Sequence, residues 1–354
     1  MKIWWKLLKK ACGKQTLNNS LQRLIGVKIE KVGIQSIVMK KFFLFIFSII
    51  SCSIVFSQST IYPHPVKFLT LAIEQQHAKM AYMDVPALKP NGKTVVLLHG
   101  KNFNGYYWKD VIPFLNEAGF RVIVPDQVGW GQSDKPNIHY SFHLLAANTK
   151  KLLDTLGIQQ VHVVAHSMGG MLATRFALMY PQTVQKLVYE NPIGLEDYKT
   201  FVPYQSVDVQ YQNELKATYE SLKKYQQSYY PQWKPEYEQY VAAQLAALQI
   251  PDFKQATWAS ALTYQMIYEQ PVVYEFKNIT QPTLIIIGQE DRTVVGKNLL
   301  SKEVAAQHGN YPQLGRWLKE QIKASRLVEL NGVGHIPHLQ SPDAFKQNVV
   351  SFLK

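Results

Sequence analysis

The sequence predicts an α/β fold in which a mostly parallel sheet is flanked by helices. Two observations lead to this prediction. Short runs of Val, Ile and Leu alternate with longer helical patterns after residue 58, which is typical of βαβ units. These runs are nearly continuous, as expected of parallel strands that are buried on both faces of their sheet.

The apolar runs are predicted to be the parallel strands. They span residues 94–100, 121–126, 161–167, 186–192, 283–288 and 326–330. Helical patterns lie between or after them, at residues 107–118, 141–156, 168–180 and 342–353. The earlier segment 66–83 is expected to supply two antiparallel edge strands.

The segment 195–277 interrupts this alternation. It has no buried strand pattern, it is helical in pattern and it is rich in aromatic residues. We therefore predict a helical cap, inserted between two parts of an α/β core at residues 58–194 and 278–354. Most of the cap aromatics are expected to pack, and some to line a cleft, because ligand sites favour apolar walls at domain junctions.

The positive charge of the chain is concentrated near its N-terminus. The formal net charge is +13, which would ordinarily indicate nucleic acid or anionic lipid as a partner. Residues 1–41 hold ten Lys or Arg and one Glu, so this segment accounts for +9 of the total. The rest of the chain is only mildly basic, and we expect a small-molecule substrate and no nucleic acid as its partner.

Residues 39–57 have the organisation of a secretory signal peptide. Two lysines precede an apolar run from Phe42 to Ile50, and small residues lie near Ser57. We therefore expect a periplasmic or secreted protein, since a membrane span needs about 20 apolar residues and this run is shorter. The open alternatives are an uncleaved N-terminal anchor and a lipoprotein lipidated at Cys52. Membrane contact is expected only through this signal or such an anchor.

Residues 1–38 form an N-terminal extension of uncertain role. They could be a basic amphipathic helix at a membrane surface. We favour a start codon at Met39, because a signal peptide should begin near the terminus. The two cysteines, Cys12 and Cys52, both precede the expected cleavage point near residue 57. The mature chain would then have neither a cysteine nucleophile nor a cysteine metal site.

Ser167 is the candidate nucleophile. It lies beyond the C-terminal end of a predicted buried strand, where open α/β sheets bind ligands. The usual turn motif is G-x-S-x-G, and the small residues Ala165 and Gly169 meet its steric requirement if Ala165 needs no positive φ. The amide of Met168 opens the next helix and is a candidate oxyanion donor. The alternative is that Ser167 only caps that helix.

Asp291 and His335 complete a candidate triad with this serine. Each follows a predicted strand, so all three side chains are expected at one edge of the sheet. A neutral imidazole can take the serine proton, and a carboxylate behind it fixes the tautomer and stabilises the imidazolium. Glu290 and Asp126 are the alternative carboxylates, and His338 is the alternative base.

These stretches resemble the α/β-hydrolase fold family, in a form with a helical cap, over about residues 66–354. The matching motifs are LLHGKNFNGYYW (97–108), PDQVGWGQSDKP (125–136), AHSMGG (165–170), GQEDRTV (288–294) and GVGHIPH (332–338). The resemblance implies that Lys101, directly after the His-Gly pair, gives the second oxyanion N–H, with Asn102 and Phe103 as alternatives. It also leads us to expect Phe103 and Trp130 at the substrate pocket.

The identity of the nucleophile limits the reactions that this resemblance implies. Haloalkane dehalogenases and epoxide hydrolases of this fold have Asp at the elbow, so Ser167 favours an acyl-enzyme formed on carboxylic esters of apolar or aromatic character. C–C bond hydrolases, lactonases, amidases and cofactor-free haloperoxidases are alternatives on the same fold, and a non-catalytic binding protein is a further one. We expect no metal ion and no other cofactor, because the sequence contains no H-E-x-x-H or G-x-x-x-x-G-K motif.

Overall fold

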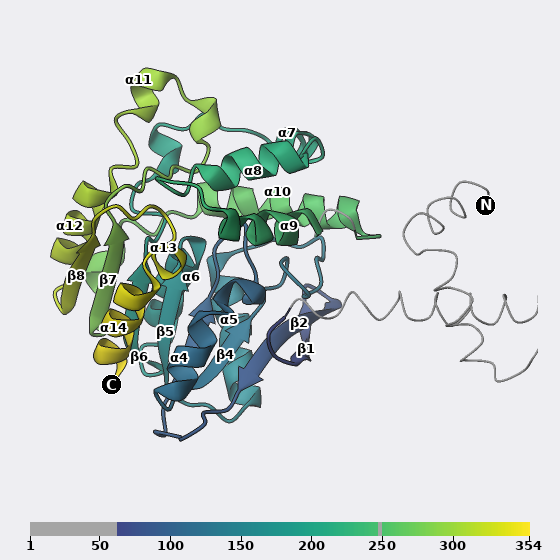
Figure 1. Cartoon of the computed structure of the whole chain (residues 1–354). Helices are drawn as coiled ribbons and strands as arrows, with labels where there is room; N and C mark the ends of the chain where they lie inside the picture. The colour runs from purple at the N-terminus through teal and green to yellow at the C-terminus, as the bar shows by residue number, and fades with distance from the viewer. Residues whose placement is uncertain (1–61, 247–249) are drawn as a thin grey trace, which may run out of the picture. The chain divides into compact units, whose positions relative to one another are not determined.

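The computed structural model describes residues 62–246 and 250–354, so the predicted extension (1–38) and signal peptide (39–57) lie outside the described residues. Eight strands form one sheet in the order β1-β2-β4-β3-β5-β6-β7-β8 (Figure 1). The pairs β1–β2 and β2–β4 are antiparallel, and the other neighbours are parallel. The predicted fold class is therefore confirmed.

The strands begin and end within two residues of the predicted bounds. They are β1 (Val66–Ile73), β2 (Gln76–Val85), β3 (Thr94–Leu98), β4 (Arg121–Pro125), β5 (Val161–His166), β6 (Val184–Glu190), β7 (Thr283–Gly288) and β8 (Ser325–Leu330). The helices of the core are α4 (Val111–Glu117), α5 (Phe142–Thr155), α6 (Met168–Met179), α11 (Lys302–Ala305), α12 (Tyr311–Gln321), α13 (Pro337–Gln340) and α14 (Pro342–Leu353).

Four core helices differ from the expectation: α4 begins later than predicted, and the predicted ranges include none of α11, α12 and α13. The helix predicted over 107–118 begins only at Val111, because Gly105–Trp108 form a separate 3₁₀ turn that the Asn104 side chain caps. Helix α12 was not predicted, since few of its residues are apolar and only three of them are buried. The apolar signal of α12 in the sequence is therefore weaker than that of helices that bury a whole face.

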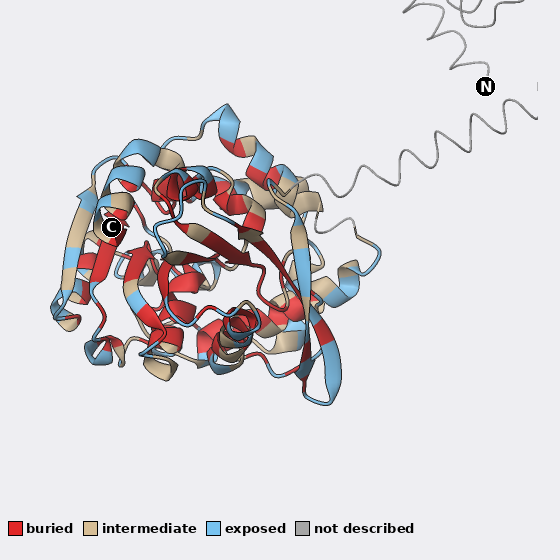
Figure 2. Cartoon of the chain, turned by 90° about the horizontal axis from the view of Figure 1, so that it is seen from below, coloured by how far each residue is buried: buried red, intermediate tan, exposed pale blue. Residues whose placement is uncertain are grey.

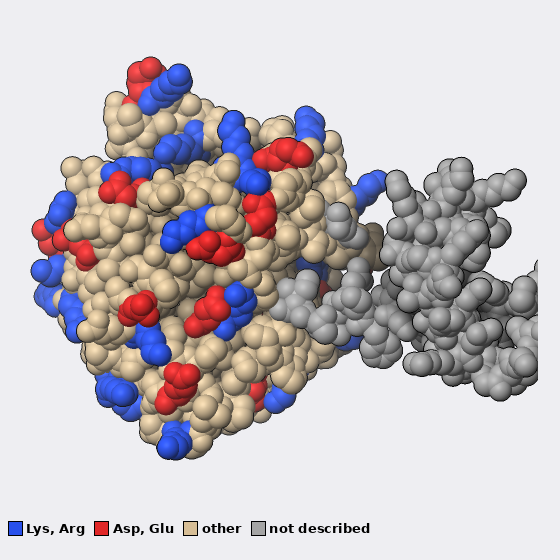
Figure 3. All heavy atoms as spheres, viewed as in Figure 1, with Lys and Arg blue, Asp and Glu red and all other residues tan. Residues whose placement is uncertain are grey.

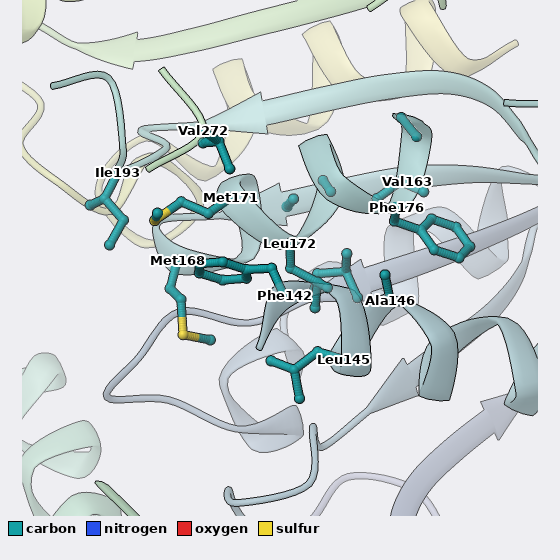
Figure 4. Close-up of a cluster of buried hydrophobic side chains, with 14 of the residues drawn as sticks. Phe142, Leu145, Ala146, Val163, Met168, Met171, Leu172, Phe176, Ile193 and Val272 are labelled. Atoms are coloured by element: carbon teal, nitrogen blue, oxygen red, sulfur yellow. The ribbon is translucent and has the colours of Figure 1, made fainter. Parts of the chain in front are cut away.

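The central strands are buried on both faces, between two layers of helices. In β5, Val163 and Ala165 pack with α5 and α6, whereas Val164 packs with α4 and α14. This alternation follows from the two-residue period of a strand. Figure 4 shows the first layer, where Leu145 of α5 lies near Leu172 of α6. Figure 2 shows that burial is concentrated in the centre of the sheet, while the marginal strands β1 and β8 are partly exposed.

Four helices lie between β6 and β7, in the segment for which we predict a cap. They are α7 (Val207–Glu214), α8 (Tyr219–Gln227), α9 (Glu238–Ala246) and α10 (Phe253–Glu269). Helix α10 packs against α7, and α8 packs against α9. In Figure 1 the four helices gather above one edge of the sheet.

The surface of the described residues carries charges of both signs. On the face in Figure 3, Lys and Arg side chains are interspersed with Asp and Glu. None of the helices in the described parts of the chain combines the length and the hydropathy that a membrane crossing requires.

Candidate active site

Ser167 lies on a sharp turn between β5 and α6. Its φ and ψ are 55° and −121°, an unfavourable region for a residue that has a Cβ. The Ser167 amide donates to the Glu190 carbonyl at 3.1 Å, and its carbonyl accepts from the Gly170 amide at 2.8 Å. The hydroxyl makes no capping hydrogen bond to α6, so the capping alternative does not describe this serine.

The residues on either side of Ser167 explain how the turn fits. A Cβ at Gly169 would lie 2.2 Å from the Leu98 carbonyl oxygen, so a side chain has no room there. Ala165 continues the ladder of β5, opposite Leu98 and Tyr189, and it is not among the residues with positive φ in the described parts of the chain. Alanine can therefore replace the usual glycine without backbone strain.

The structure brings Ser167, His335 and Asp291 into one chain of hydrogen bonds. His335 Nε2 lies 3.0 Å from Ser167 Oγ, and His335 Nδ1 lies 2.7 Å from Asp291 Oδ2. A neutral imidazole with its proton on Nδ1 donates to the carboxylate and accepts from the hydroxyl. This arrangement can transfer the serine proton to the imidazole.

Several neighbours hold Asp291 in its ionised form. Asn191 Nδ2 donates to Asp291 Oδ2 at 2.7 Å, and the Thr293 amide donates to Oδ1 at 2.8 Å. Burial by itself acts to raise the pKa of Asp291, but the charge of His335 and the three hydrogen bonds outweigh it and lower the pKa below its ordinary value. A carboxylate that stays charged can stabilise an imidazolium at His335.

The alternative residues lie in other arrangements. Glu290 is exposed to solvent. Asp126 accepts hydrogen bonds from the Gly105 amide, the Gln132 amide and the Tyr62 hydroxyl, and so joins three loop segments. Neither carboxylate contacts His335 in the described residues.

His338 pairs with a different acid. Its ring Nδ1 lies 2.8 Å from Glu190 Oε1, and its amide donates to the same oxygen at 2.7 Å. Both side chains are fully buried. The Glu190 carbonyl also accepts a hydrogen bond from the Ser167 amide. Glu190 therefore links the serine turn to α13, which directly follows the loop that carries His335.

Met168 and Lys101 are the predicted oxyanion donors, with Asn102 and Phe103 as alternatives to Lys101. The Phe103 amide donates to the Gly100 carbonyl at 3.2 Å, whereas the Asn102 amide donates no hydrogen bond within the described residues. Met168 is the first residue of α6, so its N–H has no acceptor within the helix. The Lys101 amide donates no hydrogen bond to another residue of the described chain. Its loop is close to the serine, since a Cβ at Gly100 would lie 3.1 Å from the Ser167 Cβ. Trp130 Nε1 donates to the Lys101 carbonyl at 2.6 Å and holds the loop in place.

A cavity of about 790 Å³ opens above Ser167. Its lining is largely apolar and comes from both the core and helices α7 to α10. Phe103 and Trp130, the two residues predicted at the pocket, both line it, as do Lys101 and Tyr229. The ring of Tyr229 stacks on the His335 ring with centroids 4.8 Å apart. The Tyr229 carbonyl also accepts from the His335 amide at 2.8 Å.

Sequence reasoning did not find three residues that hold the site together: Asn191, Glu190 and Tyr229. Asn191 had a detectable signal, since it follows a predicted strand and asparagine is favoured at positive φ, which is 37° here. The other two act through contacts to residues that are more than 100 positions away. Within residues 62–246 and 250–354, no cluster of His, Cys, Asp and Glu could hold a metal ion.

Comparisons with known proteins agree with this fold. A family profile described as alpha/beta hydrolase fold matches residues 93–342. A crystal structure of a probable hydrolytic enzyme from Pseudomonas aeruginosa is 45% identical with a TM-score of 0.81, over 83% of this chain and 95% of that one.

Two curated relatives extend the comparison. A 2-hydroxy-6-oxononadienedioate/2-hydroxy-6-oxononatrienedioate hydrolase of Paraburkholderia phymatum is 32% identical, over 68% of this chain and 85% of its own length. An uncharacterized protein of Mycobacterium tuberculosis is 41% identical over 105 residues, which is only 30% of each chain.

Proposed function

Because the chain belongs to the alpha/beta hydrolase fold family, we propose that it is a serine hydrolase that cleaves carboxylic esters through an acyl-enzyme. One observation carries this proposal: the hydrogen-bonded chain of Ser167, His335 and Asp291 opens into an apolar cavity. A nucleophile, a base and an orienting acid are the groups that acyl transfer requires.

The proposed reaction begins with the attack of Ser167 Oγ on the ester carbonyl carbon while His335 Nε2 accepts the hydroxyl proton. The carbonyl oxygen becomes an oxyanion and accepts hydrogen bonds from the amides of Met168 and Lys101. His335 then donates the proton to the leaving alkoxide, and the acyl group stays on Ser167. A water molecule, deprotonated by His335, attacks the acyl carbon, and the acid and free Ser167 result.

A serine-directed fluorophosphonate probe tests the nucleophile. We expect labelling of the wild-type protein and none of Ser167→Ala, because the Ser167 hydroxyl lies 3.0 Å from Nε2 of a histidine that is itself paired with a buried carboxylate. Circular dichroism of both proteins controls for folding. Equal labelling of the two proteins, or no labelling of a folded wild type, would show that the assignment is wrong.

A second candidate function is hydrolysis of a C–C bond next to a carbonyl. The similarity to the Paraburkholderia relative, a 2-hydroxy-6-oxononadienedioate/2-hydroxy-6-oxononatrienedioate hydrolase that this chain covers over 85% of its length, favours C–C bond hydrolysis. The same serine and base serve both reactions, so the substrate decides between them. A panel that contains acyl esters and 2-hydroxy-6-oxo-dienedioates, assayed on residues 58–354, separates the two by kcat/KM.

Export is part of the proposed function. The signal-peptide pattern at 39–57 supports it, and the segment lies outside the described residues. Mass spectrometry of the N-terminus of the native protein tests the proposal. A terminus near residue 58 is the expected result. A terminus at Met1 or Met39 contradicts cleavage, and a lipid on Cys52 supports the lipoprotein alternative.

A further inference from the structure

The cavity contains a lysine ammonium group that has no carboxylate partner. Lys101 Nζ donates to the Ser260 carbonyl at 3.0 Å and to Ser260 Oγ at 2.7 Å, and both acceptors are neutral. In the described residues, Lys101 forms no ion pair. An ammonium group has three N–H donors, so one of them stays available.

An ammonium group in this position lowers the stability of the fold, which suggests that it is kept for binding a ligand. A half-buried cation without a counter-ion, as Lys101 is, loses part of its solvation free energy, and an apolar side chain of the same size would pack without that loss. Burial lowers the pKa of Lys101, and the carboxylate of Glu214 opposes this effect in part. Ser260 replaces some of the lost hydration and holds the ammonium in one orientation.

The other charged residues around the cavity are mostly basic. They are Lys135, Lys224, Arg292, Lys297 and the single acid Glu214. Lys135 donates to the carbonyls of Gly131 and Ser133 and also feels the charges of Asp126, Asp134 and Asp252, so Lys101 is the clearer case of a cation without a carboxylate partner. The cavity therefore combines an apolar wall with an excess of positive charge, which favours a substrate that carries one anionic group.

The loop position of Lys101 relates this charge to the reaction. Its backbone amide is the proposed oxyanion donor, so its side chain begins beside the scissile carbonyl and ends at Ser260 on α10. We propose that Lys101 binds a carboxylate on the acyl part of the substrate, so that the preferred substrates are half-esters of dicarboxylic acids. This inference rests on the proposed ester hydrolysis and names its substrate class.

Matched pairs of substrates test the inference. Each pair has a 4-nitrophenyl half-ester of glutaric or adipic acid and the neutral 4-nitrophenyl ester of the monocarboxylic acid of similar length. We expect the wild type to prefer the half-ester in kcat/KM. In Lys101→Met the ratio of kcat/KM for the half-ester to kcat/KM for the neutral ester should fall by about 10- to 100-fold, the usual range for loss of a hydrogen bond to a charged group.

Two further variants distinguish the side chain from the general field. Lys101→Arg keeps the charge and should keep most of the preference. Lys224→Met removes a positive charge from an exposed lining residue and should change the preference far less than Lys101→Met. An equal effect of Lys224→Met would overturn the assignment to Lys101, and so would an unchanged preference in Lys101→Met.

The outcome for the wild type separates this inference from the proposed function. A protein that reacts with the fluorophosphonate probe and hydrolyses neutral esters, but shows no preference for half-esters, refutes the inference alone. A folded protein that neither reacts with the probe nor hydrolyses any ester refutes the proposed function. Fluorophosphonate labelling of each Lys101 variant verifies that Ser167 and its base are intact.

Discussion

At the scale of single residues, the site depends on which carboxylate reaches the histidine. Asp291 and Glu290 are adjacent in sequence, yet only Asp291 is buried against His335. Asn191 Nδ2 donates to Asp291 Oδ2 and the Thr293 amide donates to Oδ1, and these hydrogen bonds fix the plane of the carboxylate. Burial therefore distinguishes two chemically similar side chains.

Replacement of this carboxylate tests its role. In Asp291→Asn the amide cannot stabilise an imidazolium or favour the proton on Nδ1, and we expect kcat for ester hydrolysis to fall by about 10³- to 10⁴-fold. Glu290→Gln is the matched control, because Glu290 is exposed and surface changes usually alter free energies by only about 0.5 kcal/mol. Steady-state kinetics of both purified variants supply the comparison. Similar losses in the two variants would contradict the assignment.

At the scale of elements, the junction of β5 and α6 places the serine. The strand ends at His166, the turn has a strained φ at Ser167, and the helix begins at Met168. The hydrogen bonds to the end of β6 hold this turn in its unfavourable geometry. The local sequence provides the small residues that the turn needs, and the hydrogen bond to the end of β6 keeps Ser167 in its strained backbone conformation.

The two small residues that flank the serine should respond differently to substitution. Gly169→Ala should destabilise the fold by about 1–3 kcal/mol and reduce ester hydrolysis, because its Cβ would collide with the Leu98 carbonyl. Ala165→Gly restores the usual motif and should cost only about 0.5–1 kcal/mol while activity persists. Urea denaturation and ester kinetics measure both effects. A more stable or more active Gly169→Ala variant would contradict this account of the turn.

At the scale of the whole molecule, the packing of helices on both faces of the sheet buries histidines that cannot readily be charged. His162, at the start of β5, has no hydrogen-bond partner for either ring nitrogen in the described residues. Burial, followed by the charges of Lys186 and Lys93, lowers the pKa of His162 to about 4. The three-layer arrangement therefore ties stability to pH.

The sign of this dependence follows from proton binding. In the unfolded chain His162 takes up a proton near its ordinary pKa of about 6.5, whereas in the folded chain it does so only near 4. Between these values the unfolded state binds more protons, so stability falls as the pH falls from 6.5 toward 4.

Urea denaturation at pH 7, 5.5 and 4.5 measures the effect. The loss of unfolding free energy over this range should be smaller in His162→Gln than in the wild type. His139→Gln, which alters an exposed histidine, should retain the wild-type slope. Parallel curves for wild type and His162→Gln would show that this histidine does not contribute.

The sequence by itself determined the sheet and the location of the candidate triad. Apolar runs and helical periods are local signals, and the C-terminal ends of parallel strands necessarily meet at one edge. Ser167, Asp291 and His335 could therefore be predicted from their places after strands, and the family resemblance is confirmed. The roles of these residues, the cap boundaries and export stay predictions.

Only the tertiary structure decided how these residues are held. It paired His335 with Asp291, which lies in the loop after β7, and His338 with Glu190, which is the last residue of β6. It also brought Ser260, 159 residues away, to the ammonium of Lys101. Such contacts depend on side-chain direction and on burial after the chain has closed over long distances, and no local pattern in the sequence specifies either.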